Sequence, residues 1–405
     1  MNKKIQEARN MALKLLQPKK SQLEHGLELH RNSIVFDSYG FSPRAAIDGA
    51  ALNKLVKAGA TGIEIEDAAE EMQMTRYINN PKERKEYMLA WEASGVTCVF
   101  QNAGEEGQSI KKLIKRIARY TYATDMMKEY VVKAVTPDDI VLAKKQNKRC
   151  LYFTSNGVPL AENLTSVEEE LRYITTFFQL GSRMMHLTYN RRNLIGDGCS
   201  EPANGGLSDF GKIVVKEMNR VGVIVDISHS GLQTSFEAAK ISKKPVVASH
   251  SACLSLNRNC RCKSDEVIRA VCDSNGYTGI CCIPQFLGLS GDINALLDHV
   301  DHIVKKFGAD YAAIGTDLTY TSSRNQEEWD KVTKFIEPRA GWESFWQPDS
   351  PASAKLKNRE EVKSLMWTNW PMFTVGLVQR GYSDKDIQKI IGGNVLRVAK
   401  EVLKK

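Results

Sequence analysis

Residues 222–229 read Gly-Val-Ile-Val-Asp-Ile-Ser-His, and residues 245–250 read Pro-Val-Val-Ala-Ser-His. Each segment is an apolar run rich in β-branched residues, which predicts a buried strand, and each ends in a histidine. A third run, residues 312–317, ends in Asp317. Parallel strands of a β/α barrel bring the residues at their carboxyl ends to one face, where such folds hold metals and catalytic groups. The pattern therefore indicates a metal site at the mouth of a barrel.

The whole chain repeats this strand pattern. Apolar, β-rich runs occupy residues 33–37, 95–101, 150–155, 183–188, 222–228, 245–250, 276–283 and 312–317. Segments with helical periodicity, such as 167–180 and 209–220, separate most of them. This alternation predicts an α/β protein with a (β/α)8 TIM barrel as a single domain over residues 1–405. A doubly wound open sheet is the alternative, but no glycine-rich phosphate loop follows an early strand.

Four segments lie outside the predicted repeat. We expect an N-terminal helical segment at 1–32, an insertion after the first strand at 49–92, a candidate lid loop at 320–351 and C-terminal helices at 359–405. The insertion carries an acidic cluster between Glu64 and Glu71, which we interpret as a solvated helix face. The candidate lid carries three tryptophans and follows the last strand, where barrel proteins keep substrate loops.

Composition narrows the class of protein. The chain has 405 residues, is 42% hydrophobic and 26% charged, and carries a net charge of +8. Its lysines are spread along the chain, so we expect a mildly basic solvated surface and no nucleic-acid partner. It contains no apolar run of about 20 residues, the length that a membrane span needs. Charged residues are scattered through the first twenty positions, where a signal peptide would have an apolar run. Nine cysteines, an odd number with two adjacent, favour free thiols in a reducing compartment. We therefore expect a cytoplasmic protein without a membrane partner.

Five phrases resemble a known family. They are Leu187-Thr188-Tyr189-Asn190, residues 205–211 (GGLSDFG), residues 217–222 (EMNRVG), Asp226-Ile227-Ser228-His229 and Ser249-His250-Ser251. In this order and at these intervals they resemble the membrane (renal) dipeptidase family of zinc peptidases, within the amidohydrolase superfamily. The resemblance implies a (β/α)8 barrel, two zinc ions that activate a bridging hydroxide, a dipeptide-like substrate and a possible homodimer.

The resemblance carries over to four positions of the site. His229 and His250 match the two histidines that hold the second metal. Asp317 matches the aspartate of the eighth strand that orients the hydroxide and shuttles its proton. Arg261, followed by Asp265, matches an arginine that grips the substrate carboxylate.

Other positions depart from the family pattern. The first strand should end in a His-x-Asp ligand pair, but Tyr39 and Phe41 stand there. Ser155 aligns with the bridging glutamate of the third strand, unless Glu162 from the following loop takes its place. Tyr189 replaces a substrate-binding histidine. Because phenylalanine offers no donor atom, we expect one tightly held metal ion, zinc or another divalent metal, in place of two.

The residues that keep the family pattern are sufficient to bind one metal ion. Two neutral imidazoles and the Asp317 carboxylate suffice for one catalytic Zn²⁺ with an open position for water. Alternatively Asp317 is a general base, and the third ligand is Asn156, Glu162, Tyr39 or water. Asp226 is placed to orient an imidazole. His186, on an apolar strand, is interpreted as a core or mouth histidine.

Three hypotheses follow for the function. The first is a metal-dependent, dipeptidase-like hydrolase of small amides, in which Arg261, Tyr189 and Asn156 bind the substrate. The second is a barrel that has lost hydrolysis and binds a ligand, for which Phe41 is the main evidence. The third keeps the barrel but uses Tyr39 or Cys199 for different chemistry.

Overall fold

The computed structural model describes residues 2–104, 109–160, 166–339, 341–346 and 359–403. Eight parallel strands form the central sheet in the order β1 (Phe36–Gly40), β2 (Cys98–Asn102), β4 (Arg149–Ser155), β5 (Ser182–His186), β6 (Ile224–Asp226), β7 (Val246–Cys253), β9 (Tyr277–Ile280) and β10 (Ala312–Ile314). Each strand overlaps one of the eight predicted runs, so the predicted TIM barrel is confirmed.

The barrel closes between its first and last strands. The Asp317 N–H donates to the Tyr39 carbonyl (3.0 Å), and the Phe41 N–H donates to the Leu318 carbonyl (3.1 Å). Two residues earlier in β1, the buried Asp37 carboxylate accepts hydrogen bonds from the Thr316 N–H (2.9 Å) and hydroxyl (2.6 Å). These bonds hold the end of β1 against the segment that carries Asp317.

Two short strands lie outside the barrel path. β3 (Val131–Ala134) pairs with the first half of β4, and β8 (Cys262–Lys263) pairs with the end of β7. Neither strand is predicted from the sequence, because runs of four and two residues carry too little periodicity to be recognised. β8 matters for the site, since it continues from Arg261.

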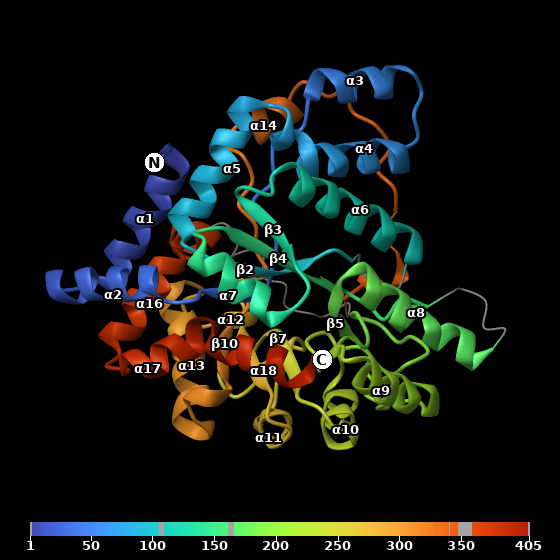
Figure 1. Ribbon diagram of the computed structural model, residues 1–405, viewed down its shortest axis with the longest axis vertical. Helices are drawn as coiled ribbons and strands as arrows, with labels where there is room; N and C mark the ends of the chain where they lie inside the picture. Colours follow the sequence, from blue (N-terminus) through green and yellow to red (C-terminus); the bar gives the residue numbers. More distant parts are fainter. Residues whose placement is uncertain (1, 105–108, 161–165, 340, 347–358, 404–405) are drawn as a thin grey trace.

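The helices between the strands cover the outside of the barrel (Figure 1). They are α6 (Ile110–Met126), α7 (Pro137–Lys145), α8 (Val167–Leu180), α9 (Asp209–Val221), α10 (Leu232–Ile241), α11 (Asp265–Asp273) and α13 (Ile293–Phe307). In α9, the Ser208 hydroxyl caps the first turn by accepting from the Gly211 N–H (2.9 Å). The helix buries Val214, Val215 and Met218 and ends at Gly222 with φ +93°, a left-handed conformation that suits glycine. The chain then enters β6.

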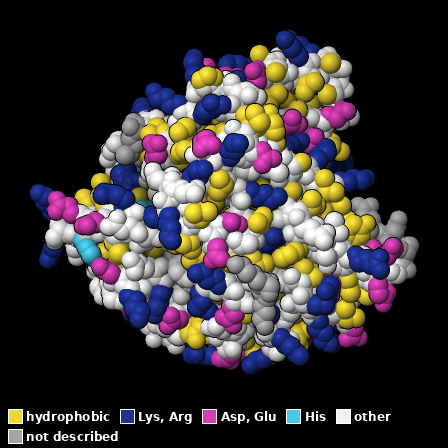
Figure 2. Space-filling view, in the orientation of Figure 1, with side chains coloured by type: hydrophobic (Ala, Val, Ile, Leu, Met, Phe, Trp, Pro, Cys, Tyr) yellow, Lys and Arg dark blue, Asp and Glu magenta, His cyan; other side chains and the backbone are white. Residues whose placement is uncertain are grey.

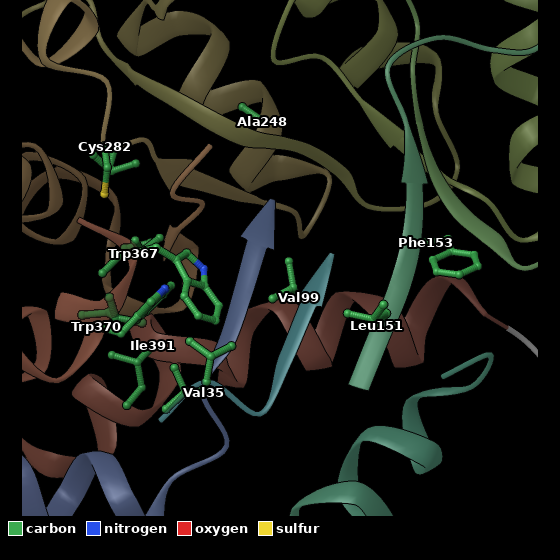
Figure 3. Packing of buried hydrophobic residues seen from close by; sticks show 14 of the residues in the cluster. Val35, Val99, Leu151, Phe153, Ala248, Cys282, Trp367, Trp370 and Ile391 are labelled. Carbon is green, nitrogen blue, oxygen red and sulfur yellow. The ribbon is translucent and has the colours of Figure 1, made fainter. Parts of the chain in front are cut away.

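The amino end of the barrel is closed by apolar residues. Helix α18 (Asn394–Val402) packs Val395, Val398 and Val402 against residues at the starts of the strands, including Phe36 and Cys98. Beside β1, Figure 3 shows Trp367 and Trp370 packed next to Val35 and Ile391. The opposite end, where the strands finish, is therefore the one left for polar groups.

The two ends of the chain pack together. α1 (Lys3–Leu16) and α2 (Lys20–Asn32) contact α16 (Trp370–Gln379), and α17 (Asp384–Gln388) follows (Figure 1). Two histidines of the helical segments lie inside the molecule, although helix position alone favours the surface. His30 of α2 hydrogen-bonds to Thr374 (2.8 Å) and Ser94 (2.8 Å), and His299 of α13 accepts the Cys253 N–H (2.9 Å). Both imidazoles are buried because the helices that carry them lie under other elements.

The insertion after β1 forms α3 (Gly49–Lys57), α4 (Gly62–Thr75) and α5 (Pro81–Ser94). The acidic cluster on α4 was predicted to be a solvated helix face, but it faces the basic side chains of α6. Glu70 bonds to Arg116 and Arg119 of α6, and Asp67 pairs with Lys115 (2.9 Å) and Arg119 (3.0 Å). The cluster therefore fastens the insertion to the barrel, and only the tertiary contact with α6 reveals this.

Basic and acidic side chains are intermixed over the face of the molecule shown in Figure 2. Among the described residues, no helix is long and apolar enough to span a membrane, and no disulfide bond is formed.

Candidate metal centre

His229 and His250 come together at the carboxyl ends of β6 and β7. Asp226 is the last residue of β6, and its Oδ1 accepts the Ser228 N–H (2.9 Å). This side-chain bond forms a turn between the end of β6 and His229. The Nε2 atoms of the two imidazoles lie 3.1 Å apart. The second nitrogens are held by protein, because His229 Nδ1 lies 2.9 Å from the Asn190 amide oxygen and His250 Nδ1 lies 2.8 Å from the Ser249 hydroxyl. An amide oxygen only accepts, so His229 carries its proton on Nδ1 and leaves Nε2 as a lone pair.

Both imidazoles are neutral. Burial lowers the pKa of His229 well below its ordinary value, and the positive charge of Arg261 lowers it further. The same two causes, burial first, lower the pKa of His250. A neutral imidazole is the form that binds a metal ion.

A third histidine belongs to this cluster. His186 ends β5 and is fully buried, and its ring centre lies 5.2 Å from that of His250 and 5.4 Å from that of His229. Its Nε2 lies 2.7 Å from Asp226 Oδ2. Although burial opposes ionisation of Asp226, His186 and the hydroxyl of Ser249 hold the pKa of this carboxyl well below its usual range. From the sequence, His186 was interpreted as a core or mouth histidine and was not counted among the ligands.

Two buried cations stand beside the histidines. Arg261 donates from Nη2 to His229 Nε2 (3.2 Å) and to the His250 carbonyl (3.1 Å), and from Nη1 to the Ser228 carbonyl. Its guanidinium also lies over the ring of Phe286, 5.2 Å from the centre. Lys263 donates to the Ser230 carbonyl (2.6 Å), and burial lowers its pKa to about 7. This side of the mouth is therefore electropositive and suited to an anion.

The substituted ligand positions lie on the opposite side of the mouth. Tyr39 stacks on the His250 ring with 3.7 Å between centres, and its hydroxyl donates to Asn156 Oδ1. Phe41 packs edge-on against Tyr39 (6.0 Å). Ser155 turns its hydroxyl to the Gly157 carbonyl (2.9 Å). Glu162 lies outside the described residues.

Asp317 and Tyr189 complete the set of predicted site residues. Asp317 is half-buried and has φ +56°, a left-handed conformation that is uncommon outside glycine and that often marks functional positions. Burial and the nearby Asp317 carboxylate both raise the pKa of Tyr39 well above its ordinary value. Tyr189 stacks on the His229 ring with 4.0 Å between centres.

The segment after β10 reaches across this mouth. The Asn190 amide nitrogen donates to the Ser344 carbonyl (3.3 Å), the Arg191 guanidinium lies 4.5 Å from the Trp342 ring centre, and the rings of Phe286 and Trp346 lie 5.9 Å apart. Asn190 also holds His229, and Phe286 lies in α12 (Pro284–Leu287) under Arg261. Residues 342–346 thus contact the groups that position the site.

The nitrogens of His229 and His250 have the spacing of two ligands to one metal ion. Two nitrogens bound to one tetrahedral Zn²⁺ at 2.0–2.1 Å lie about 3.3 Å apart, close to the 3.1 Å between His229 Nε2 and His250 Nε2. On the β1 side, Phe41 has no donor atom, and the neutral hydroxyls of Tyr39 and Ser155, which donate to Asn156 Oδ1 and to the Gly157 carbonyl, are not among the groups that ordinarily hold zinc. The β1 side therefore offers no strong ligand for a second ion among the described residues, whereas donor atoms of His186, Asp226 and His250 lie within 4.8 Å of one another.

By fold, the protein is a TIM barrel, and a buried group of histidine and carboxylate donors lies at the carboxyl ends of its strands, where this class of protein holds its metals. Its sequence then assigns the family. Residues 28–344 match the family model for membrane dipeptidase (peptidase family M19), and the chain belongs to that family.

Similar proteins agree with this assignment. The chain is 30% identical over 247 residues to dipeptidase verJ of Clonostachys rogersoniana, covering 60% of this chain and 54% of that protein. It is 25% identical over 331 residues to dipeptidase tcpJ of Claviceps purpurea, covering 80% and 65%. The chain thus spans about half to two thirds of the length of these relatives.

Solved structures share the fold. An amidohydrolase from Pseudomonas aeruginosa superposes with a TM-score of 0.66 at 25% identity, covering 93% of this chain and 98% of that one. The probable dipeptidase PvdM from the same organism gives a TM-score of 0.67 at 19% identity, covering 95% and 98%. A metallo peptidase from Rhodobacter sphaeroides gives 0.62 at 15% identity, covering 92% and 100%.

Proposed function

We propose that this protein is a dipeptidase-like hydrolase of small amides that works with one metal ion. The observation that carries the proposal is the pair of neutral imidazoles whose Nε2 atoms lie 3.1 Å apart at the ends of β6 and β7. Family membership supports it, because residues 28–344 match a family of dipeptidases. The ion is zinc or another divalent metal.

His229 and His250 would hold this ion, and Asp317 would serve as ligand or proton acceptor. A bound ion of this kind polarises a carbonyl and lowers the pKa of its water to about 7. Asp317 lies where β1 and the end of β10 meet, with its N–H bonded to the Tyr39 carbonyl. Its negative charge raises the pKa of both Tyr39 and Arg261. As proton acceptor, its carboxylate takes a proton from the attacking water and passes it to the leaving amine.

Arg261, Tyr189 and Asn156 would bind the substrate. The buried guanidinium keeps one donor, Nε–H, without a hydrogen-bond partner among the described residues. A carboxylate would satisfy that donor and the positive charge of this side of the mouth. The Rhodobacter sphaeroides neighbour is liganded with a phosphinate mimic of the dipeptide L-Ala-D-Ala, so dipeptides are the first substrates to test. Residues 342–346 would act as part of a lid from the candidate segment 320–351, of which 340 and 347–351 lie outside the described residues.

A second candidate is a barrel that binds its ligand without hydrolysing it. Arg261 is the observation that favours it, because Nη2 donates to His229 Nε2, the atom that a metal would need. In this case the guanidinium replaces the ion and binds an anionic ligand directly. Retained ligand affinity in metal-free protein would distinguish this candidate from the hydrolase.

Metal stoichiometry tests the proposal. Elemental analysis is made on protein purified without chelator or nickel affinity, for the wild type and for His229→Ala/His250→Ala. About one ion per chain, absent from the double variant, supports a mononuclear hydrolase. Two ions per chain would show that the β1 side binds metal after all. No ion, even after reconstitution, refutes the hydrolase mechanism.

A further inference from the structure

Three imidazole rings form a nearly equilateral triangle at the end of the barrel. The ring centres of His229 and His250 lie 5.1 Å apart, those of His186 and His250 lie 5.2 Å apart, and those of His186 and His229 lie 5.4 Å apart. The planes are inclined to one another by 58°, 71° and 65°, so no two of these rings stack. The rings come from the ends of β5, β6 and β7, which are neighbours in the barrel.

The ring spacing is that of three imidazoles around one metal ion, and donor atoms of His186, Asp226 and His250 lie within 4.8 Å of one another. In a tetrahedral zinc site each nitrogen lies 2.0–2.1 Å from the ion, and the ring centre lies roughly 1.1 Å behind the nitrogen, so ring centres are about 5.2 Å apart. The observed spacings of 5.1–5.4 Å bracket this value. Three histidines leave a fourth position for water, which is the arrangement of a catalytic zinc.

Each ring also has a protein group beside one of its nitrogens. Asn190 stands beside His229 Nδ1, Ser249 beside His250 Nδ1, and the Asp226 carboxylate beside His186 Nε2. A metal-binding histidine ordinarily has its second nitrogen held by a carboxylate, carbonyl or similar acceptor. The nitrogens left over are His229 Nε2, His250 Nε2 and His186 Nδ1.

His186 lacks what a buried histidine normally has. It is fully buried, and its Nε2 lies 2.7 Å from Asp226 Oδ2, which holds it. Its Nδ1 has no hydrogen-bond partner among the described residues. A buried polar group without partners is costly and calls for an explanation such as an absent ion.

We propose, on the basis of the proposed function, that His186 is the third protein ligand of the metal ion. The site then consists of His186, His229 and His250, with Asp226 as the group that positions His186. Asp317 is released from metal binding and is the proton acceptor. The ion is held by the three strands that keep their polar groups, and the loss of ligands from β1 and β4 is compensated from β5.

Arg261 must adjust when the ion binds. Its Nη2 lies 3.2 Å from His229 Nε2, so the bond between them breaks as the nitrogen turns to the metal. The guanidinium keeps its bonds to the Ser228 and His250 carbonyls. It thereby stays beside the ion, where it can receive a carboxylate.

Zinc affinity of defined variants tests this assignment. Metal-free protein is titrated with Zn²⁺ against a chromophoric chelator, for the wild type, His186→Gln, Asp226→Asn and Asp317→Asn. We expect at least a 100-fold loss of affinity in His186→Gln, a loss of about 10- to 100-fold in Asp226→Asn, and little change in Asp317→Asn. His30→Gln is the matched control, because it alters another buried histidine outside the site and leaves zinc affinity unchanged. Wild-type affinity in His186→Gln, or a large loss in Asp317→Asn, overturns the assignment.

X-ray absorption on the zinc-loaded wild type gives a readout that does not depend on the folding of any variant. Three imidazole ligands support the assignment, and two or fewer overturn it. If the ion is bound and is lost in His229→Ala but has only two imidazoles, this inference fails while the proposed function stands. If the wild type binds no zinc, both fail together.

Discussion

The two sides of the barrel mouth differ in the chemistry of their side chains. The side built by β5, β6 and β7, here called the histidine wall, presents His186, His229, His250 and the Asp226 carboxylate, all buried. The side built by β1 and β4, the aromatic wall, presents Tyr39, Phe41, Ser155 and Asn156. The histidine wall keeps nitrogen atoms with available lone pairs, whereas the aromatic wall bonds its polar atoms to itself. One mouth therefore places buried nitrogen and carboxylate donors on one side and packed aromatic rings on the other.

The largest expected effect comes from removing a ligand of the histidine wall. His250→Ala should lower kcat/KM on a dipeptide by about 10⁴-fold, which corresponds to about 5.5 kcal/mol, because the ion and its polarised water are lost. Steady-state kinetics with metal-loaded protein measure this. A variant that retains activity within tenfold would show that the wall does not hold the catalytic group.

The second effect concerns stability on the same wall. Asp226→Ala removes a buried carboxylate that accepts from the hydroxyls of Ser228 (2.7 Å) and Ser249 and faces His186. We expect the free energy of unfolding in urea to fall by roughly 3–5 kcal/mol, because the partner groups are left buried and unpaired. Asp209→Ala, at an exposed helix start, is the control and should change little. A loss below about 1 kcal/mol in Asp226→Ala would mean that the network is not tightly coupled.

The third effect is a pH dependence set by Lys263, which lies behind the histidine wall. Burial lowers the pKa of Lys263 from 10.5 to about 7. Between these values the unfolded chain holds a proton that the folded chain has released, so this residue makes the free energy of unfolding rise with pH by roughly 1.4 kcal/mol per unit. Urea unfolding between pH 7 and 9.5 should show this rise in the wild type, and Lys263→Met should lack it. Parallel curves for the two proteins would show that Lys263 titrates normally.

The smallest effect is expected on the aromatic wall. Tyr39→Phe keeps the ring that stacks on His250 and removes only the hydroxyl bonded to Asn156. Stability should fall by about 1 kcal/mol, and zinc affinity should be unchanged. Thermal unfolding and the zinc titration measure the two quantities. If zinc affinity falls as well, the phenol contributes to the metal site and the two walls are not as distinct as their side chains indicate.

The sequence carried enough information for the barrel and for two of the three histidines that meet at its mouth. Strand periodicity located all eight barrel strands, and His229 and His250 were found because a strand end is a recognisable place. His186 was missed although it directly precedes the phrase Leu187-Thr188-Tyr189-Asn190. Counting alternate residues along β5 would have placed it on the same face as Thr188, but periodicity does not say whether that face points into a site or into a packed core.

The sequence by itself determined the class of fold, the family and the positions that depart from the family pattern. These depend on residue type and spacing along the chain, which a linear pattern records. Only the tertiary structure decided which side chains share the mouth: that His186 faces Asp226, that Arg261 bonds to His229, and that residues 342–346 contact Asn190 and Phe286. The physical reason is that these contacts join residues from separate strands and loops, so their distances follow from the register and closure of the barrel.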